Sequence, residues 1–172
     1  TYNEAVQFMY SIMCSYNSAN KTSAATISKW TSTMQANNIP TWAYESTASA
    51  LENGILSSSD LKIFMANAST QNNARREDVG VIFGKALSKI YQVNPSATVN
   101  YNDKSQISAS SIPYLELLNR LNLMVGDENN NFNPKKNINR AEMAVLATKT
   151  YNELKGGSSS KPSNPTVNEQ VI

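Results

Sequence analysis

The sequence of 172 residues contains no histidine and a single cysteine, Cys14. Without histidine, the chain has neither the imidazole ligands of common zinc sites nor the base of a histidine-dependent catalytic triad. One cysteine cannot form a disulfide within the chain. Cys14 follows Ile12 and Met13, so we expect it to be an inert, small apolar side chain buried along a helix. These shortages exclude the commonest hydrolytic and zinc-dependent sites.

Charged residues and long apolar runs are also scarce. Asp, Glu, Lys and Arg make up 16% of the residues, and the net charge at pH 7 is +2. This small net charge gives no electrostatic basis for binding nucleic acid or an anionic membrane. No apolar run approaches the ~18 residues of a membrane-spanning helix, so we expect no membrane insertion.

Apolar residues recur at the three- and four-residue intervals of an amphipathic helix in five segments. The predicted helices cover residues 1–16, 39–53, 75–90, 110–121 and 139–154. The intervening residues 17–38 are predicted to be a long connection with at most one weak helical turn. Residues 55–73 are predicted to be a loop with one aromatic anchor, Phe64.

The periodicity also predicts which side chains face inward. In the first helix these are Ala5, Phe8, Met9, Ile12, Met13 and Tyr16. In the third they are Val79, Ile82, Phe83, Ala86, Leu87 and Ile90. In the last they are Met143, Leu146, Ala147, Thr150, Tyr151 and Leu154. The second helix has a narrow face of small residues that would let another helix approach closely, namely Ala43, Thr47, Ala50 and Leu51.

The sequence contains an internal repeat, and its two copies can be aligned residue by residue. When Gly54 is placed over Asn122, Phe64 falls on Phe132, since each Phe stands ten residues further on. Gly and Asn are the residues that most often end a helix in the left-handed conformation. A unit of two short helices around a Phe-bearing loop cannot bury its own apolar faces, so we expect neighbouring units to share a core.

The same register aligns the helix starts. With three extra residues in the earlier loop, Arg75 falls on Arg140 and Glu77 on Glu142. Glu142 also follows Asn139 at the spacing of a capping box, and Glu4 follows Thr1 at the same spacing. We therefore expect all three glutamates to be capping carboxylates.

The segment from Gly126 to Glu142 resembles the S-layer homology (SLH) domain. That repeat ends in a Gly-Asp loop, a Phe-x-Pro step and a Thr-Arg-Ala-Glu helix start, which stand here as 126–127, 132–134 and 139–142. The resemblance covers roughly residues 1–155 and is strongest in 99–155. It implies an all-α fold of tandem helix–loop–helix repeats packed as a pseudo-threefold helical bundle.

The resemblance also divides the chain. Residues 1–18 would be the terminal helix of a truncated first repeat, 19–93 the second repeat and 94–155 the third. Residues 156–172 are rich in Gly, Ser and Pro, which predicts a flexible linker or tail.

SLH modules anchor exported bacterial proteins non-covalently to a secondary cell-wall polysaccharide, which often carries pyruvylated amino sugars. We therefore expect an extracellular protein at the bacterial cell surface, with no enzymatic activity and no cofactor. Family pockets lie in grooves between repeats and use an Asp, a Trp, a loop Gly and the Arg of the helix start. A fixed guanidinium suits the carboxylate of a pyruvyl ketal, and Trp offers a flat face to a sugar ring.

Carried onto this sequence, the predicted polysaccharide-binding residues are Arg75, Arg140, Asp103, Trp42 and Gly126. In the Asp position of the second repeat stands Gln35, and in the Trp position of the third stands Ser110. Tyr2 holds the Arg position of the truncated first repeat. No single repeat keeps the whole set, so we expect one or two composite pockets.

Simpler roles stay open for these residues. An Arg in the first turn of a helix is commonly solvated, Trp42 can be a core residue, and Asp103 can be a turn or cap residue. The main rival function is a degenerate repeat bundle that assembles with other surface-layer chains through protein–protein contacts. The acidic run at Asp127 does not continue as a calcium loop, because the sixth position is Phe132 and the twelfth is Ile138.

Overall fold

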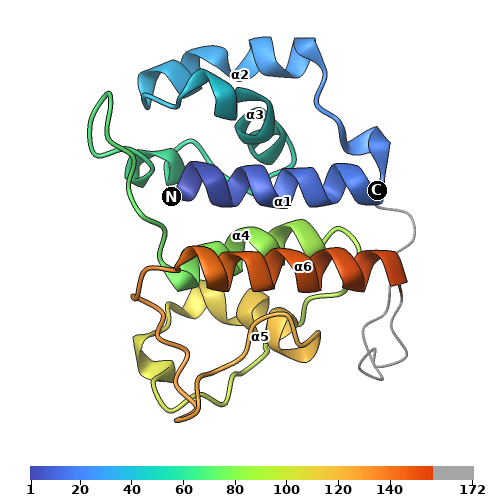
Figure 1. Ribbon diagram of the computed structural model, residues 1–172, viewed down its shortest axis with the longest axis vertical. Helices are drawn as coiled ribbons and strands as arrows, with labels where there is room; N and C mark the ends of the chain where they lie inside the picture. The colour runs from blue at the N-terminus through green and yellow to red at the C-terminus, as the bar shows by residue number, and fades with distance from the viewer. Residues whose placement is uncertain (157–172) are drawn as a thin grey trace. The chain divides into compact units, whose positions relative to one another are not determined.

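The computed structural model describes residues 1–156 (Figure 1). These residues form α-helices and short 3-10 helices with two isolated β-bridges and no β-strand, which confirms the all-α prediction. The chain divides into two compact units, Thr1–Ala74 and Arg75–Ile172. This division falls inside the predicted second repeat. The predicted repeat boundaries and the pseudo-threefold packing stay predictions, and the predicted linker lies, apart from Gly156, outside the described residues.

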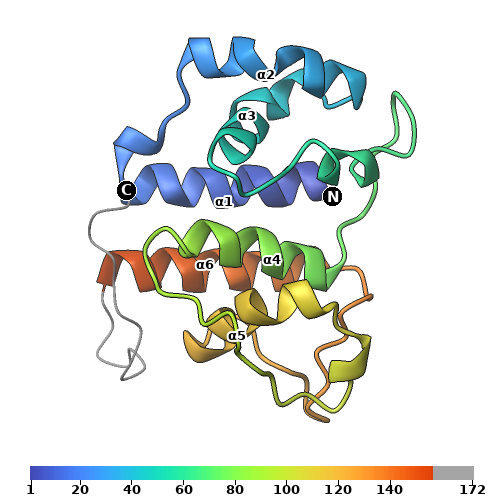
Figure 2. The same cartoon turned by 180° about the vertical axis from the view of Figure 1, so that it is seen from behind.

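The first unit consists of α1 (Tyr2–Tyr16), α2 (Ala24–Ala36) and α3 (Tyr44–Glu52). Helix α3 packs against both of the others, and it lies between them in both views (Figures 1 and 2). The predicted small-residue face of α3 is buried, with Ala43, Thr47 and Ala50 each at 0% exposure. Small side chains therefore let two helices approach α3, as the sequence predicts.

Helix α1 begins with the predicted capping box, since Glu4 N donates to Thr1 Oγ1 and the Thr1 amine donates to the Glu4 carboxylate. Its buried face is only partly the predicted one. Phe8 and Tyr16 are 46% and 39% exposed, so their inward prediction was wrong. The buried residues are Tyr2, Asn3, Ala5, Val6, Met9, Tyr10, Ile12 and Met13. Phe8 lies just outside the arc of buried positions, whereas Tyr16 lies within that arc but is the last residue of the helix.

Tyr10 joins α1 to the rest of the first unit. Its hydroxyl donates to Glu45 Oε1 at 2.6 Å and accepts from Thr22 N at 2.9 Å. Burial and the hydrogen bond to Glu45 raise the pKa of Tyr10 to about 12. Cys14, on the same helix, is only partly buried rather than buried as expected, and this burial raises the pKa of its thiol. A raised pKa leaves less of the reactive thiolate at neutral pH, in agreement with the inert role expected for this residue.

Within residues 17–38, predicted to be a connection with at most one weak helical turn, Ala24–Ala36 form the 13-residue helix α2, so that prediction was wrong. Ser23 caps α2 by accepting a hydrogen bond from Thr26 N at 3.1 Å. Met34 is the only buried residue of α2, which explains why the apolar periodicity is too weak to reveal the helix. Tertiary contacts to α3 support it: Trp30 Nε1 and Lys29 Nζ donate to the Glu52 carboxylate at 2.7 and 2.8 Å.

The ends of α3 and α5 (Ile112–Arg120) use the predicted geometry. Gly54 has φ +69° and Asn122 has φ +57°, so both adopt the left-handed conformation. The loop after each helix buries its Phe, and Phe64 and Phe132 are each 1% exposed. The repeat register predicted at these positions is therefore confirmed by backbone and burial together.

The second unit consists of α4 (Arg76–Leu87), α5 and α6 (Arg140–Gly156). Every residue predicted to face inward from the segment 75–90, which contains α4, is buried. Gly80 and Gly84 on α4 let α5 come close. A Cβ on Gly84 would lie 2.6 Å from Tyr114 Cβ and 3.1 Å from its backbone, and one on Gly80 would overlap Leu115.

Helix α6 buries Met143, Leu146 and Thr150 as predicted, but Tyr151 is 41% exposed and does not face inward. The buried residue near this end is Glu153, whose Oε1 accepts a hydrogen bond from the Tyr91 hydroxyl at 2.9 Å. A polar pair thus replaces the expected apolar contact.

Candidate functional site

Four of the five predicted binding residues lie in the second unit, namely Arg75, Asp103, Gly126 and Arg140. Trp42 lies in the first unit, in the 3-10 helix Thr41–Ala43 just before α3. Half of Trp42 is exposed, so it is not a residue of the core. Its ring presents apolar surface to solvent.

Asp103 holds the Phe132 loop. Its Oδ1 accepts a hydrogen bond from Phe132 N and its Oδ2 accepts one from Asn133 N, both at 2.8 Å. Because each carboxylate oxygen can accept more than one hydrogen bond, these contacts leave some acceptor capacity on both. The side chain is therefore at least a loop anchor, which is the turn role considered for it.

Gly126 lies against an aromatic ring. A Cβ at this position would stand 3.1 Å from Tyr101 Cε1 and 3.2 Å from Asn130 Oδ1. The Tyr101 ring in turn packs on Phe132, with ring centroids 5.2 Å apart. Gly126 thus lets the loop cross the face of Tyr101 closely.

The acidic loop closes on itself. Asp127 Oδ1 accepts hydrogen bonds from Asn129 N and Asn131 N, and its Oδ2 accepts one from Asn133 Nδ2. These hydrogen bonds lower the pKa of the Asp127 carboxyl. Across residues 1–156 no cluster of three acidic or sulfur ligands could hold a metal ion.

Arg76, which the sequence did not single out, contacts several separate parts of the second unit. Its Nε donates to Phe132 O at 2.8 Å, and its Nη2 donates to Val125 O at 2.8 Å. Its Nη1 bonds the Glu142 carboxylate at 3.0 Å, and the guanidinium lies 5.0 Å from the Phe132 ring centroid. The side chain therefore ties the loop between α5 and α6 to the start of both α4 and α6.

Backbone hydrogen bonds give the register of the helix starts. The carbonyls of Thr1, Arg75 and Asn139 accept the first intrahelical bonds, from Ala5, Val79 and Met143 respectively. Arg76, rather than Arg75, therefore stands at the first helical position that Arg140 and Tyr2 occupy. The aromatic contacts agree, because Tyr2 stacks on Phe64 with centroids 5.1 Å apart, as Arg76 lies over Phe132. The predicted alignment is one residue out at α4.

The glutamates divide into two roles. Glu4 and Glu142 complete capping boxes, with Glu142 N donating to Asn139 Oδ1 at 2.8 Å. Glu77 does not cap, so that prediction was wrong. Its carboxylate accepts from Ser108 N at 2.8 Å and pairs with Lys135 Nζ at 2.7 Å, and its side chain is 3% exposed. Burial alone would raise the pKa of Glu77, but the hydrogen bonds from Lys135 and Ser108 outweigh it and hold that pKa below its usual value.

Arg75 and Arg140 are both exposed and lie on neighbouring stretches of backbone. Arg75 pairs with Asn137 in an antiparallel bridge, and Arg140 follows Asn137 by three residues. Lys136, also exposed, lies in the same stretch. The structure thus brings two of the predicted binding residues to one positively charged edge, which we call the arginine edge (Arg75, Lys136 and Arg140).

Comparison with known proteins agrees with the sequence motifs. No curated protein and no solved structure matches the chain. Within residues 1–156, no helix has both the length and the apolar character required to cross a membrane. The family model of the S-layer homology domain matches residues 100–144, a segment that includes Asp103, Gly126 and Arg140. Residues 100–144 are thus similar to the S-layer homology domain, a non-catalytic module that generally anchors proteins to the cell wall, and the match indicates association with the cell surface.

Proposed function

We propose that this chain acts as a cell-wall anchor by binding an anionic, pyruvylated saccharide of a secondary cell-wall polymer. The observation that carries the proposal is the arginine edge. Lys136 and Arg140 lie within the segment that matches the S-layer homology domain, and Arg75 pairs with Asn137 of that segment. Two guanidinium groups on neighbouring backbone segments suit a carboxylate, because each can donate two parallel hydrogen bonds to it.

The surrounding loop supports this role by being held in place. Asp103 bonds two successive amides of the loop, and Arg76 bonds two of its carbonyls. A binding edge that is already ordered loses less conformational entropy when a ligand arrives. In this proposal Arg75 and Arg140 contact the carboxylate, while Asp103 and Gly126 shape the loop beside them.

The test is co-sedimentation of the full chain with purified cell walls, before and after chemical removal of the attached polysaccharide. We expect the chain to pellet with intact walls and to stay in solution with stripped walls. Equal pelleting with both preparations, or with neither, would contradict the proposal. Equal pelleting with both would favour an assembly module that contacts other surface-layer chains.

Arg140→Ala sharpens the test. Losing a charge-assisted hydrogen bond of about 1.5–3 kcal/mol should weaken wall binding by roughly tenfold or more. Arg140→Lys should recover only part of the affinity, because an ammonium cannot form the paired hydrogen bonds of a guanidinium. Lys149→Ala removes a positive charge elsewhere on the same helix and should bind as the unchanged chain does. Unchanged binding by Arg140→Ala would make that residue a solvated helix start.

A further inference from the structure

One face of α6 is exposed although the corresponding faces of α1 and α4 are buried. The first intrahelical hydrogen bonds place Ala144 of α6 in register with Val6 of α1 and Gly80 of α4. In α1 this face is buried and consists of Asn3, Val6, Tyr10 and Met13. In α4 it is also buried and consists of Glu77, Gly80, Gly84 and Leu87. In α6 it is exposed and consists of Ala141, Ala144, Thr148 and Tyr151, which we call the outer face of α6.

A short helix covers this face in each of the other two cases. Helix α3 packs on α1, and α5 packs on α4 (Figures 1 and 2). At Gly80 and Gly84 the side chains nearest to an added Cβ belong to Leu115 and Tyr114 of α5. Because the outer face of α6 stands at the same positions, its shape matches a short helix that packs in the same way.

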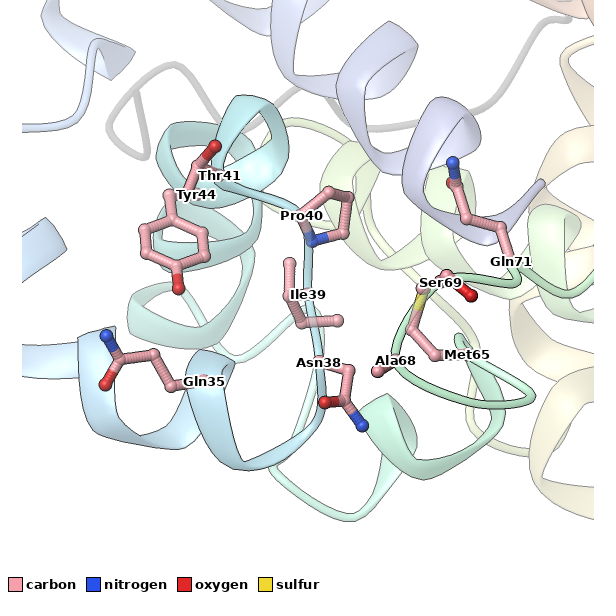
Figure 3. Close-up of a pocket in the computed structure, with 10 residues that line it drawn as sticks. All are labelled: Gln35, Asn38, Ile39, Pro40, Thr41, Tyr44, Met65, Ala68, Ser69 and Gln71. Carbon is pink, nitrogen blue, oxygen red and sulfur yellow. The ribbon is translucent and has the colours of Figure 1, made fainter.

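The first position of the face separates a helix from a loop as its occupant. In α1, Asn3 donates to Gln71 Oε1 at 3.1 Å and contacts Met65 Sδ at 3.4 Å, and both partners line the cleft shown in Figure 3. Glu77, at this position of α4, is likewise bonded to loop residues. Ala141 of α6 has only a methyl group here, which cannot hold a polar loop. The outer face of α6 therefore matches a helix alone.

The chemistry of this side of α6 defines the helix that it matches. Val145 and Tyr151 are 52% and 41% exposed, and Lys155 Nζ lies 5.7 Å from the Tyr151 ring centroid. The acidic residues of α6, Glu142 and Glu153, are both bonded within the fold. A helix that packs here should therefore have apolar side chains on one side and a negative charge.

The sequence that follows α6 has these properties. Asn164 and Pro165 are a residue that caps helices and one that is favoured at the first helical position. Val167 and Val171 stand four residues apart, so they lie on one side of a helix. Both are apolar, and the residues between them are polar. This stretch lies outside the described residues, and its sequence is that of a short amphipathic helix.

The stretch can reach the outer face of α6 and complements its charge. Eight residues, 157–164, separate the end of α6 from Pro165, and helix–helix connections of about 2–8 residues are usual. From Pro165 onward the one charged residue is Glu169. On α6, Lys149 and Lys155 carry the opposite charge, which favours the approach of an acidic segment.

We propose that residues 165–172 fold as a short helix on the outer face of α6, as α3 does on α1 and α5 on α4. A helix that runs antiparallel to α6 would bring Val167 toward Tyr151 and Val171 toward Thr148. An isolated helix this short is marginal in water, so docking and helix formation occur together. The proposal does not depend on wall binding, because none of these residues belongs to the arginine edge.

The experiment is amide hydrogen exchange of the full chain, followed residue by residue by NMR. We expect the amides of 168–172 to exchange at least about tenfold more slowly than in an unfolded chain, which corresponds to a docked population of about 90%. Thr148→Asp places a charge beneath the docked helix and should abolish this protection. Val167→Ser combined with Val171→Ser should do the same, because it removes the apolar contacts. Exchange of 168–172 at unfolded rates in the unchanged chain would overturn the proposal.

Two controls make the result specific. Ser105→Asp makes a similar change at another exposed residue of the second unit and should keep the protection. The amides of α6 itself should stay protected in Thr148→Asp, because Thr148 is exposed and its replacement leaves the core unchanged. Protection of 168–172 that survives Thr148→Asp would place the segment elsewhere and overturn the proposal. Protection that is lost on dilution would show docking onto a second copy of the chain, which also contradicts it.

Discussion

Adjacent residues at the start of α4 have different roles. Arg75 is exposed on the arginine edge, Arg76 is bonded to a loop and to α6, and Glu77 is buried between Ser108 and Lys135. Their order along the helix decides which face each side chain reaches, since successive helical residues are turned by about 100°. A shift of one residue in the alignment therefore exchanges an exposed arginine for one that is bonded within the fold.

Glu77→Gln should lower stability in a pH-dependent way. The folded-state pKa of Glu77 is held below the unfolded value, so its contribution is complete above the unfolded pKa of about 4.3 and is lost as the pH falls through the folded pKa. We expect the substitution to lower the free energy of unfolding by about 1–3 kcal/mol at pH 7, with a smaller difference at pH 3. Urea unfolding of both proteins across this range measures the effect.

The control is Glu128→Gln, since Glu128 is exposed and has no partner in the described part of the chain. It should unfold like the unchanged protein at every pH. A difference for Glu77→Gln that does not shrink toward pH 3 would mean that Glu77 acts by shape rather than by charge.

Trp42→Ala tests the one predicted binding residue in the first unit. Because half of the ring is exposed, its loss should change the free energy of unfolding by less than about 1 kcal/mol. If the ring stacks on the wall polymer, pelleting with intact walls should fall several-fold. Unaltered pelleting would remove Trp42 from the binding set, and Phe8→Ala, which truncates another largely exposed ring of the first unit, serves as the control.

Among the elements, helices with a wide apolar stripe were predictable and the helix without one was not. Helix α4 buries all the residues that its periodicity predicts, whereas α2 buries only Met34. Helix α2 depends instead on a cap at Ser23 and on contacts to Glu52 of α3. Gly80 and Gly84 on α4 also act through tertiary contacts. They lower helix propensity, but they let α5 pack closely against α4.

Gly84→Ala should destabilise the protein even though alanine favours helices. The helix gains up to about 1 kcal/mol, but the new Cβ meets the Cβ and backbone of Tyr114, and overpacking costs about 1–3 kcal/mol. We expect a net loss of about 1–2 kcal/mol in chemical unfolding. At Gly156 a Cβ would meet nothing within 4 Å, so Gly156→Ala is the control and should cost nothing. A more stable Gly84→Ala protein would show that α5 can move to accommodate the new methyl group at little energetic cost.

In the whole molecule, the two compact units share one structural feature. In each, the first residue of a helix lies on the Phe of a following loop, Tyr2 on Phe64 and Arg76 on Phe132. Each pair closes its own unit, so each Phe should matter most to the unit that contains it.

Phe64→Ala and Phe132→Ala should each cost about 3–5 kcal/mol, because both rings are buried. In amide hydrogen exchange, Phe64→Ala should first lose protection within residues 1–74 and Phe132→Ala within residues 75–156. Phe8→Ala, which truncates a largely exposed ring, is the control and should change little. Equal loss of protection in both units from either substitution would show that the chain opens as one cooperative unit.

Features that depend on neighbouring residues could be predicted from the sequence. The capping boxes at Thr1 and Asn139, the left-handed stops at Gly54 and Asn122 and the Phe anchors follow from residue type and spacing, and the S-layer homology motif follows from the same stretch. These features form within a few residues of the chain, so a local pattern contains the information.

Contacts between residues that are distant in the sequence became known from the three-dimensional fold. It made Arg76 a link between loop and helices, turned Glu77 from a cap into a buried ion pair, and formed α2 against α3. It also brought Arg75 beside the segment that leads to Arg140. Each of these depends on partners more than 20 residues away in the chain, and no spacing along the sequence records which of them will meet.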